Sequence, residues 1–301
     1  MDPLEKLDLG WDTSLCLLRE LNLRGHETFI FVPRLLSLEA GRVTGMGRPI
    51  SPLGGNRYRE ETFERFDLAG FDAVLVRKDP PFDSNYLALT YLLEPLTRKT
   101  LVVNHPRGIR DANEKLFGLS SSHWSPPTLV SSQPEEILAF QRKIKTDLVI
   151  KPLYEKGGKG VFKWKCGENQ RRLAQATRGG KVWVVAQKFI PVAGGSGDKR
   201  ILLWRGEILG AFERIPRAGE FRSNLSLGGK FRKCGITGTE KRLVKNLRPV
   251  LLKEGLLLVG IDVRSERLIE VNVTSPAGLV ELDLLYGNRA TKRVADDLEK
   301  M

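Results

Sequence analysis

Residues 256–276 read LLLVGIDVRSERLIEVNVTSP, and this stretch decides the fold class of the second part of the chain. Two apolar runs flank the turn Arg264-Ser265-Glu266, which predicts an antiparallel pair of strands. A second hairpin is predicted around Arg205-Gly206-Glu207, and residues 240–254 carry leucines at helical spacing. Antiparallel strands combined with a helix in this way predict an α+β domain.

Three oxygen-bearing side chains lie on the strand pair predicted in this stretch. Asp262 ends the first strand, and Glu270 and Asn272 lie two residues apart on the second. Side chains alternate along a strand, so Glu270 and Asn272 share a face, and the hairpin can bring Asp262 opposite them. Two carboxylates and an amide oxygen suit Mg²⁺. A solvated hairpin face would show the same spacing, so the spacing alone leaves both interpretations open.

Basic residues and glycines upstream are candidates for binding phosphate. Lys151 lies within the apolar strand predicted at residues 149–153, where a lysine contacts an anion or extends outward to solvent. The loop Lys156-Gly157-Gly158-Lys159-Gly160 follows, and it is either a cradle of backbone N–H groups for phosphate or a flexible surface turn. Arg200, after the glycine-rich residues 194–197, can bind a phosphate or carboxylate bidentately.

The first third of the chain has a different pattern, in which short apolar strands alternate with helices. Strands are predicted at residues 27–32, 71–76 and 101–104, and helices at residues 13–23 and 84–96. Strands separated by helices predict a parallel, Rossmann-like α/β sheet. The glycine- and proline-dense residues 41–56 are expected to form a hairpin or loop.

A unit of this kind normally opens with a strand, and none precedes the helix predicted at residues 13–23. Either the sheet is one strand short, or the true start codon lies upstream of Met1. We favour the second explanation. An upstream coding sequence without an in-frame apolar strand would exclude it.

The composition is that of a globular protein whose charge is unevenly distributed. Of the 301 residues, 41% are hydrophobic and 28% charged, and the formal net charge is +13. Through Ala112 the chain has 15 Lys/Arg against 16 Asp/Glu, and from Asn113 it has 34 against 20. A nucleic-acid binder and a pocket for ATP and an acidic substrate would both produce this surplus. Residues 217–233 carry five basic side chains and one acidic one, and form either a clamp for an anionic substrate or a solvated basic face.

Membrane spans and disulfides are not expected. No apolar run approaches the roughly 18–20 residues that span a bilayer. The three cysteines, Cys16, Cys166 and Cys234, are far apart and odd in number, which fits a reducing cytosol. The sequence therefore predicts a cytoplasmic protein without a membrane partner.

Several motifs follow one another along nearly the whole chain. They are Val76-Arg77-Lys78-Asp79-Pro80-Pro81-Phe82-Asp83, Asn113-Glu114-Lys115-Leu116-Phe117, Ile150-Lys151-Pro152-Leu153, Gly197-Asp198-Lys199-Arg200, Arg214-Ile215-Pro216, Arg222 with Asn224 and Gly228-Gly229, Gly260-Ile261-Asp262, and Glu270-Val271-Asn272-Val273-Thr274-Ser275-Pro276. Together, and in this order, they resemble the prokaryotic glutathione synthetase family. The first is the most specific, since it is similar to the family's R-K-D-P-P-F-D signature.

The resemblance implies a Rossmann-like pre-ATP-grasp domain at residues 1–112, followed by an ATP-grasp fold at residues 113–301 with a lid sub-domain at about residues 118–190. It implies an ATP-dependent ligase that forms a peptide bond between γ-glutamylcysteine and glycine through an acyl-phosphate, giving glutathione. Mg²⁺, or Mn²⁺ in its place, is the implied metal, and ATP is the co-substrate. A homo-oligomer such as a homotetramer is also implied.

The resemblance also implies roles for individual residues. Arg200 would stabilise the acyl-phosphate and the tetrahedral intermediate, and Arg222 would lie with Asn224 in the loop that covers the active site. Lys115 and Lys151 would contact ATP phosphates. The remaining nucleotide-binding candidates are Gly157, Gly158, Gln187, Lys188, Phe189, Ile190, Asp198 and Lys199, with residues 187–190 as the adenine hinge. The metal ligands would be Asp262, Glu270 and Asn272.

Two departures from the family pattern leave the substrates open. Gly10-Trp11 stands where the family carries a lysine pair, and the glycine loop with Lys156 and Lys159 is more basic than is usual. One alternative is therefore an ATP-grasp ligase that joins another amino acid or amine to an acidic peptide. Another alternative is a basic nucleic-acid-binding protein on a degenerate ATP-grasp scaffold, although the expected partners are small molecules and not nucleic acid.

Overall fold

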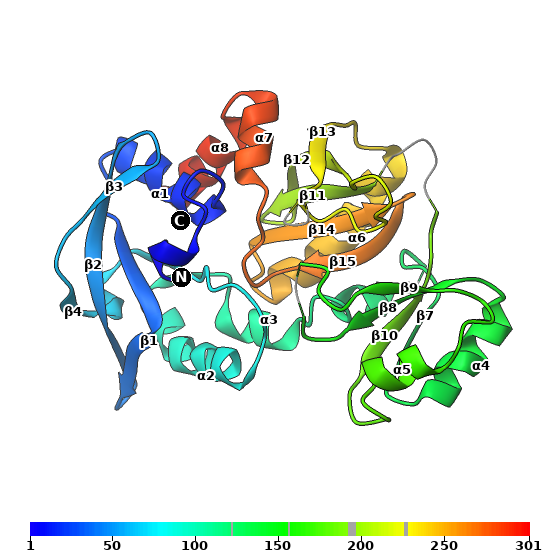
Figure 1. Ribbon diagram of the computed structural model, residues 1–301. Helices are drawn as coiled ribbons and strands as arrows, with labels where there is room; N and C mark the ends of the chain where they lie inside the picture. Colours follow the sequence, from blue (N-terminus) through cyan, green and yellow to red (C-terminus); the bar gives the residue numbers. More distant parts are fainter. Residues whose placement is uncertain (122, 156, 192–196, 226–227) are drawn as a thin grey trace.

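The computed structural model describes residues 1–121, 123–155, 157–191, 197–225 and 228–301. Figure 1 shows three regions: an N-terminal region in blue and cyan, a smaller region in green, and a central sheet in yellow and orange between them. The green region, from β7 to β10, is named the lid after its expected role. Lys156 and residues 194–196 of the predicted glycine-rich segment lie outside the described residues.

The N-terminal region contains an antiparallel sheet and three helices. Asp12 caps the first helix by accepting the backbone N–H groups of Ser14 and Leu15. The sheet has the order β1-β2-β3, with β4 paired to β2. The strands are β1 (Phe29–Glu39), β2 (Arg42–Gly54), β3 (Arg57–Glu60) and β4 (Glu64–Asp67), and the helices are α1 (Thr13–Leu23), α2 (Ser84–Leu93) and α3 (Pro106–Asp111).

Two expectations for this region were wrong in detail. The segment at residues 41–56, expected to be a hairpin or loop, is mostly the long strand β2, which forms hairpins with β1 and β3 and also pairs with β4. β1 also continues past Pro33, where the sequence indicated an end. The pairing with β2 shifts register between Phe31 and Leu36, and this irregularity accommodates a proline that cannot donate to the ladder.

The expected parallel pairing is present in one place. β5 (Ala73–Leu75) and β6 (Leu101–Val103) form a two-stranded parallel sheet. No strand joins this pair to the sheet of β1 within the described residues. The Rossmann-like sheet is therefore divided into two pieces.

The lid is a four-stranded antiparallel sheet of order β7-β10-β8-β9 with two helices on it. Its core is formed by Ile137 and Leu173 from the helices and Trp164 from a strand, all fully buried. Its elements are β7 (Thr128–Ser131), α4 (Pro134–Ile144), β8 (Leu148–Pro152), β9 (Phe162–Trp164), α5 (Arg171–Ala176) and β10 (Val184–Lys188).

The central sheet has the order β13-β12-β11-β14-β15 and is covered on both faces. α6 begins with a capping box in which Thr237 and Glu240 each accept the other's backbone N–H. Its buried Leu243, Leu247 and Leu251 pack on one face, and each contributes roughly 1.5–3 kcal/mol by burial. The elements are β11 (Asp198–Trp204), β12 (Glu207–Ile215), β13 (Lys230–Lys233), α6 (Gly238–Lys253), β14 (Leu258–Arg264), β15 (Arg267–Asn272), α7 (Leu279–Tyr286) and α8 (Arg289–Leu298).

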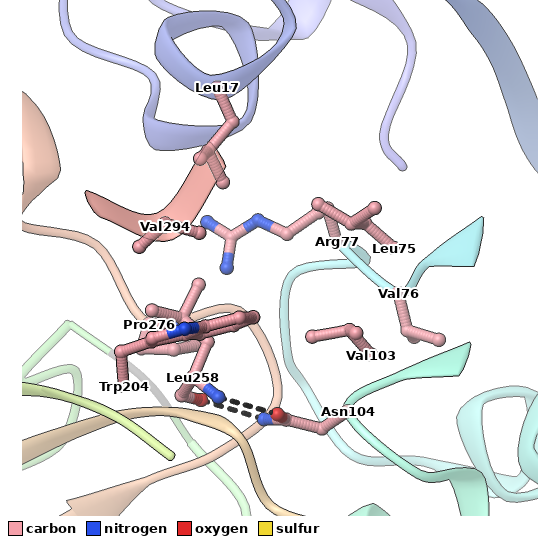
Figure 2. Close-up of a pocket in the computed structure, with 10 residues that line it drawn as sticks. All are labelled: Leu17, Leu75, Val76, Arg77, Val103, Asn104, Trp204, Leu258, Pro276 and Val294. Atoms are coloured by element: carbon pink, nitrogen blue, oxygen red, sulfur yellow. Dashed lines mark hydrogen bonds between the residues drawn. The ribbon is translucent and has the colours of Figure 1, made fainter. Parts of the chain in front are cut away.

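Asn104 fastens the N-terminal region to the central sheet. Its side chain donates to the carbonyl of Leu258 at 2.7 Å and accepts the N–H of Leu258 at 2.8 Å. Figure 2 shows these bonds beside a small cavity into which the guanidinium of Arg77 extends. Gly108 adds a close backbone approach, since a Cβ there would lie 2.0 Å from the carbonyl oxygen of Glu254. The two regions are thus held in direct contact.

Candidate active site

Lys151 lies at the centre of the lid sheet and is buried. It pairs with Val185 on β10, and its Nζ donates to Oε1 of Gln187 at 2.8 Å. Burial lowers the pKa of the Lys151 ammonium to about 8; the charge of Lys115 adds to this, and the charge of Glu270 opposes it. Burial thus disfavours the charged form of Lys151, and an anionic ligand would stabilise it.

Lys115 lies in a turn after α3 and not in a helix. Asn113 holds the turn by accepting the backbone N–H of Lys115. The Nζ of Lys115 donates to the carbonyl of Glu155 at 2.6 Å and lies 3.6 Å from Oε1 of Glu270. Lys115 therefore bridges the lid and the central sheet.

The three candidate metal ligands lie on one face of the β14–β15 pair. Asp262 is directly opposite Glu270, and Asn272 is opposite Gly260. The amide nitrogen of Asn272 donates to the carbonyl of Gly260 at 3.1 Å and to Oδ2 of Asp262 at 3.4 Å. The amide oxygen of Asn272 remains as the group that can bind a cation.

An arginine cluster surrounds Asp262. Arg200 binds both oxygens of Asp262, at 2.6 and 3.1 Å, and Arg214 reaches Oδ2 at 2.9 Å. Burial opposes the ionisation of Asp262, but the two guanidinium groups lower its pKa to about 2. Asp198 also binds Arg214, at 2.7 Å. Burial of Asp198, together with the charge of Asp262, raises the pKa of Asp198. Asp262 lies opposite Glu270, so this cluster of two arginines and two aspartates lies beside Glu270 on the sheet.

Lys199 lies on the other face of the central sheet. Its Nζ donates to Oε2 of Glu240 and to the carbonyl of Gly235, both at 2.7 Å. It precedes Arg200 on β11, and side chains alternate along a strand, so the two point in opposite directions. This differs from the nucleotide contact expected for Lys199, and we leave it out of the proposed site.

Two loops, one after β8 and one after β12, are in contact. Nη1 of Arg222 donates to the carbonyl of Gly158 at 3.0 Å, and its Nη2 binds Glu220. The Arg222 guanidinium lowers the pKa of Glu220 to about 2. Gly158 has φ of +75°, and a Cβ there would lie 2.8 Å from Oδ1 of Asn224. Gly158 and the 217–225 segment are thus in direct contact.

The predicted adenine hinge lies at the end of β10. Gln187 and Lys188 are the last residues of this strand, and Phe189 and Ile190 follow it. The Nζ of Lys163 lies 4.0 Å from the centroid of the Phe189 ring. Gln187 holds Lys151, so the hinge and the phosphate candidate are in direct contact.

Comparisons with known proteins decide the family. The prokaryotic glutathione synthetase N-terminal domain matches residues 1–110, and the prokaryotic glutathione synthetase ATP-grasp domain matches residues 114–287. The chain belongs to the prokaryotic glutathione synthetase family. The expected fold class and an ATP-dependent ligase activity that forms glutathione are confirmed at this level.

Relatives of this glutathione synthetase family member match along their whole length. The glutathione synthetase of Nitrosomonas europaea is 39% identical over all of this chain and 96% of its own length. That of Synechococcus elongatus is 40% identical over 95% of this chain and 93% of its own.

Solved structures share the fold at low identity. The ATP-grasp ligase PsnB complexed with minimal precursor superposes with a TM-score of 0.63 at 18% identity, covering 96% of this chain and 95% of that one. The RimK domain ATP-grasp protein from Sphaerobacter thermophilus has a TM-score of 0.56 at 20% identity, covering 94% of each chain. No helix among the described residues is both long and apolar enough to span a membrane.

The residues of this glutathione synthetase site fit a divalent cation that also has phosphate ligands. In the described ranges no three His, Cys, Asp or Glu side chains gather as a metal cluster, so protein carboxylates alone do not complete a site. Glu270 and the amide oxygen of Asn272 are hard oxygen ligands beside Lys115 and Lys151. Asp262 is already occupied by two guanidinium groups and one amide. It can take a cation only if one of these donors moves.

Sequence reasoning missed three residues of the site. Arg214 appeared only as part of a motif, although it binds both Asp198 and Asp262. Glu114 is half-buried and accepts three bonds from Val273 and Thr274. Burial and the charge of Glu270 raise the pKa of Glu114. An acidic residue immediately before Lys115 was the signal that could have indicated it.

Glu281, the third missed residue, lies in the first turn of α7. It is buried, and its Oε2 has no hydrogen-bond partner among the described residues. Burial raises the pKa of Glu281, and the charges of Arg200 and Arg214 oppose the rise. A buried carboxylate with an unused acceptor next to two arginines is ready to bind a donor.

Proposed function

We propose that this chain forms glutathione by joining the cysteinyl carboxylate of γ-glutamylcysteine to the amine of glycine, with conversion of ATP to ADP and phosphate. One observation carries the proposal. Lys115 and Lys151, from the linker and the lid, converge with Glu270 on the face of the central sheet that also holds Arg200 and Asp262. This places groups for a triphosphate beside groups for a carboxylate.

The reacting carboxylate is that of the cysteine residue of γ-glutamylcysteine, and glycine supplies the amine. A carboxylate is a poor electrophile, so the γ-phosphoryl group of ATP must first convert it into an acyl-phosphate. Lys115 and Lys151 are suited to neutralise the phosphate charge during this transfer. Both now donate to protein oxygens that phosphate oxygens can replace.

Glu270, Asn272 and Asp262 are the proposed ligands of Mg²⁺ or Mn²⁺. When bound, the cation would neutralise charge on the ATP phosphates. Glu270 and Asn272 present the available oxygens, and Asp262 orients Arg200 and Arg214. We therefore assign the larger share of cation binding to Glu270 and Asn272.

Arg200 and Arg214 are placed to stabilise the negative oxygen that develops when the amine attacks. Each guanidinium is fixed by Asp262, so it needs little reorganisation during the reaction. Nη1 of Arg200 also donates to the carbonyl of Ala277 at 3.0 Å, just before α7. Glu281 on α7 supplies an unused acceptor for the glycine ammonium, and it can take the proton that this group must lose before the free amine attacks.

The contact between Arg222 and Gly158 supports a role for these loops in excluding water from the proposed site. An acyl-phosphate hydrolyses when water reaches it, so a closed cover favours transfer to the amine. Asn224 lies against the same glycine. These residues are proposed to close the site and not to carry the chemistry.

An acceptor other than glycine is the second candidate. Trp11, at the position where the family carries a lysine pair, is 45% exposed, and its ring lies 5.7 Å from that of Phe231 next to the basic loop. This apolar contact would favour a less polar substrate than the family's.

Four further proposals are supported by the family resemblance. They are the division at residues 112 and 113, the lid at about residues 118–190, the cytoplasmic location, and a homo-oligomer such as a homotetramer.

Phosphate release by the purified protein tests the function. The assay contains ATP, Mg²⁺ and γ-glutamylcysteine, with glycine or one of a panel of other amines. We expect release that depends on both peptide and glycine, with glutathione as the product. Release that depends on a different amine would identify the second candidate, and release without any amine would contradict ligation.

A further inference from the structure

The 217–225 segment is held at two neighbouring residues, which bind different parts of the protein. Nη1 of Arg222 donates to the carbonyl of Gly158 in the lid, and Nη2 of Arg264 donates to the carbonyl of Phe221 at 3.1 Å. Arg264 is the last residue of β14. The segment therefore connects the glycine loop of the lid with one end of the central sheet.

Arg264 is a half-buried cation that binds the segment. Its one side-chain hydrogen bond among the described residues goes to Phe221, and its Nε is buried without a partner there. Burial lowers the pKa of its guanidinium; the charge of Asp198 opposes this, and the charge of Arg214 adds to it. An arginine stays charged in a protein, so the carbonyl of Phe221 is the group that compensates this cation.

Phe189 joins the same contact to the lid. It follows β10 in the proposed adenine hinge, and its backbone N–H donates to the carbonyl of Asp147 at 2.9 Å. Its ring lies edge-on to that of Phe221, with centroids 6.2 Å apart, and Cζ of Arg264 lies 6.0 Å from its centroid. Edge-to-face and cation–π contacts of this kind are attractive. Arg264 and Phe221 therefore bind each other and contact the same hinge residue.

This contact differs from the other link between the lid and the central sheet. In the proposed function ATP is held between these two parts, and it leaves only when they separate. Lys115 links them through the carbonyl of Glu155 and through Glu270, but its ammonium is also a candidate phosphate ligand. The contact of Arg264 uses no group assigned to the phosphates, so it can persist while ATP is bound.

We propose that Arg264 is a positioning residue that holds the 217–225 segment against the adenine hinge, where it slows the release of ATP and keeps the cover over the acyl-phosphate in place. The inference rests on the proposed function, which places Arg222 in that cover. Arg264 acts through Phe221 and Phe189 and not on the reacting atoms. Loss of its guanidinium should therefore change the release of nucleotide and the protection of the acyl-phosphate together.

Four variants of the full chain test the proposal. Arg264→Met removes the donors and the charge but keeps an unbranched side chain, and Arg264→Lys keeps the charge and one donor group. Phe221→Leu keeps the carbonyl that Arg264 binds and removes the ring. Arg267→Met is the matched control, since Arg267 lies across the same turn, is exposed and donates to the carbonyl of His123.

The first measurement is the rate at which excess ATP displaces a fluorescent, non-hydrolysable ATP analogue in the presence of Mg²⁺, without peptide or amine. We expect Arg264→Met to release the analogue at least about tenfold faster than the parent, because a charge-assisted hydrogen bond is lost. Arg264→Lys should restore most of the slow release, and Phe221→Leu should show an intermediate rate. Arg267→Met should match the parent.

Thermal unfolding of each variant separates positioning from a purely structural role. A lower Tm with unchanged release of the analogue would show a structural contact only and would overturn the proposal, and so would parent-like release in both Arg264→Met and Phe221→Leu. Where Arg264→Met does not fold, Phe221→Leu alone decides.

Phosphate released per glutathione formed is the second measurement. It should rise at least about twofold in Arg264→Met. A double variant with Arg222→Ala should match Arg222→Ala alone, because both substitutions release the same segment. Effects that multiply in the double variant would show that Arg264 acts outside the segment and would overturn the coupling. Failure of the proposed function would appear separately, as an absence of glycine-dependent phosphate release by the parent, which the displacement measurement does not require.

Discussion

Asp262 and Glu270 lie directly opposite each other on β14 and β15, yet their carboxylates have different surroundings. Asp262 is buried and binds Arg200 and Arg214. Glu270 is partly exposed and lies 3.6 Å from Lys115. Asp262 therefore fixes the two arginines, whereas Glu270 has oxygens that can bind a cation.

Glu270→Gln should reduce glutathione formation by at least about 100-fold, because the amide is a neutral and weaker ligand for a cation. The Mg²⁺ concentration needed for half-maximal activity should rise as well. Glu266→Gln, in the turn of the same hairpin, is the matched control and should leave activity unchanged. Retained turnover of Glu270→Gln, with unfolding like that of the parent, would contradict the ligand assignment.

Arg200→Lys should lower kcat by roughly 100- to 1,000-fold, because a lysine cannot bind both oxygens of Asp262 and also reach the carbonyl of Ala277. Binding of ATP should change little. Arg232→Lys is the control, since Arg232 is exposed and pairs with Glu213 at the edge of the sheet. A substituted enzyme with near-normal kcat would remove Arg200 from the chemistry.

The activity should decline in alkaline solution because of Lys151. The pKa of its ammonium is about 8 in the free protein, so kcat/KM for ATP should fall as the pH rises through that value. Lys151→Arg should move the decline to higher pH, if it binds ATP at all. A profile that is flat from pH 7 to 10 would argue against a phosphate contact by Lys151.

The pH dependence of stability gives a second measurement on Lys151. Its expected direction is opposite to that of activity, because the free energy of unfolding should rise with pH. Below pH 8 both the folded and unfolded states hold the proton. Between pH 8 and about 10.4 only the unfolded state holds it, so this residue makes the free energy of unfolding rise with pH, by about 3 kcal/mol across the window. Lys151→Met should abolish that contribution in urea titrations at pH 8 and 10.

Arg222→Ala should uncouple ATP consumption from ligation. Loss of the bond to the Gly158 carbonyl opens the contact between the two loops, so water reaches the acyl-phosphate. Phosphate released per glutathione formed should rise at least about twofold from a value near one. Arg217→Ala, in the same basic segment, serves for comparison, and an unchanged ratio in Arg222→Ala would disprove the closing role.

Glu281→Gln should impair use of glycine and leave binding of ATP intact. The carboxylate is proposed to hold the ammonium and take its proton, so kcat should fall at least about tenfold and the KM for glycine should rise. Glu299→Gln, at an exposed position near the end of the chain, is the control. Normal glycine kinetics in Glu281→Gln would show that the open acceptor has another purpose.

Local signals in the sequence predicted much of the architecture. The helix predicted at residues 13–23 is α1, and the apolar strand predicted around Lys151 is β8. The hairpin of residues 256–276 places Asp262 opposite Glu270, as its alternation predicted. Binding of a metal by these residues stays a prediction.

Features that depend on distant partners could not be predicted. The segment at residues 41–56, expected to be a hairpin or loop, is mostly β2 because β1, β3 and β4 supply partners for it. Lys199 faces Glu240 because α6 packs on that side of the sheet, and a dipeptide such as Lys199-Arg200 carries no sign of which residue faces which side. Arg214 joined the cluster only through the antiparallel register that sets it beside Asp198.

Glu114 has a consequence for exchanging parts between relatives. It follows the proposed division of the chain by two residues, yet it grips Val273 and Thr274 just after the strand that carries Glu270. A chimaera joined between residues 112 and 113 would take Glu114 and its partners Val273 and Thr274 from the same parent. A graft of the N-terminal region alone keeps the bonds of Glu114 within one parent, whereas a graft that replaces residues 113–117 without residues 271–274 would disturb the loop that follows the strand of Glu270.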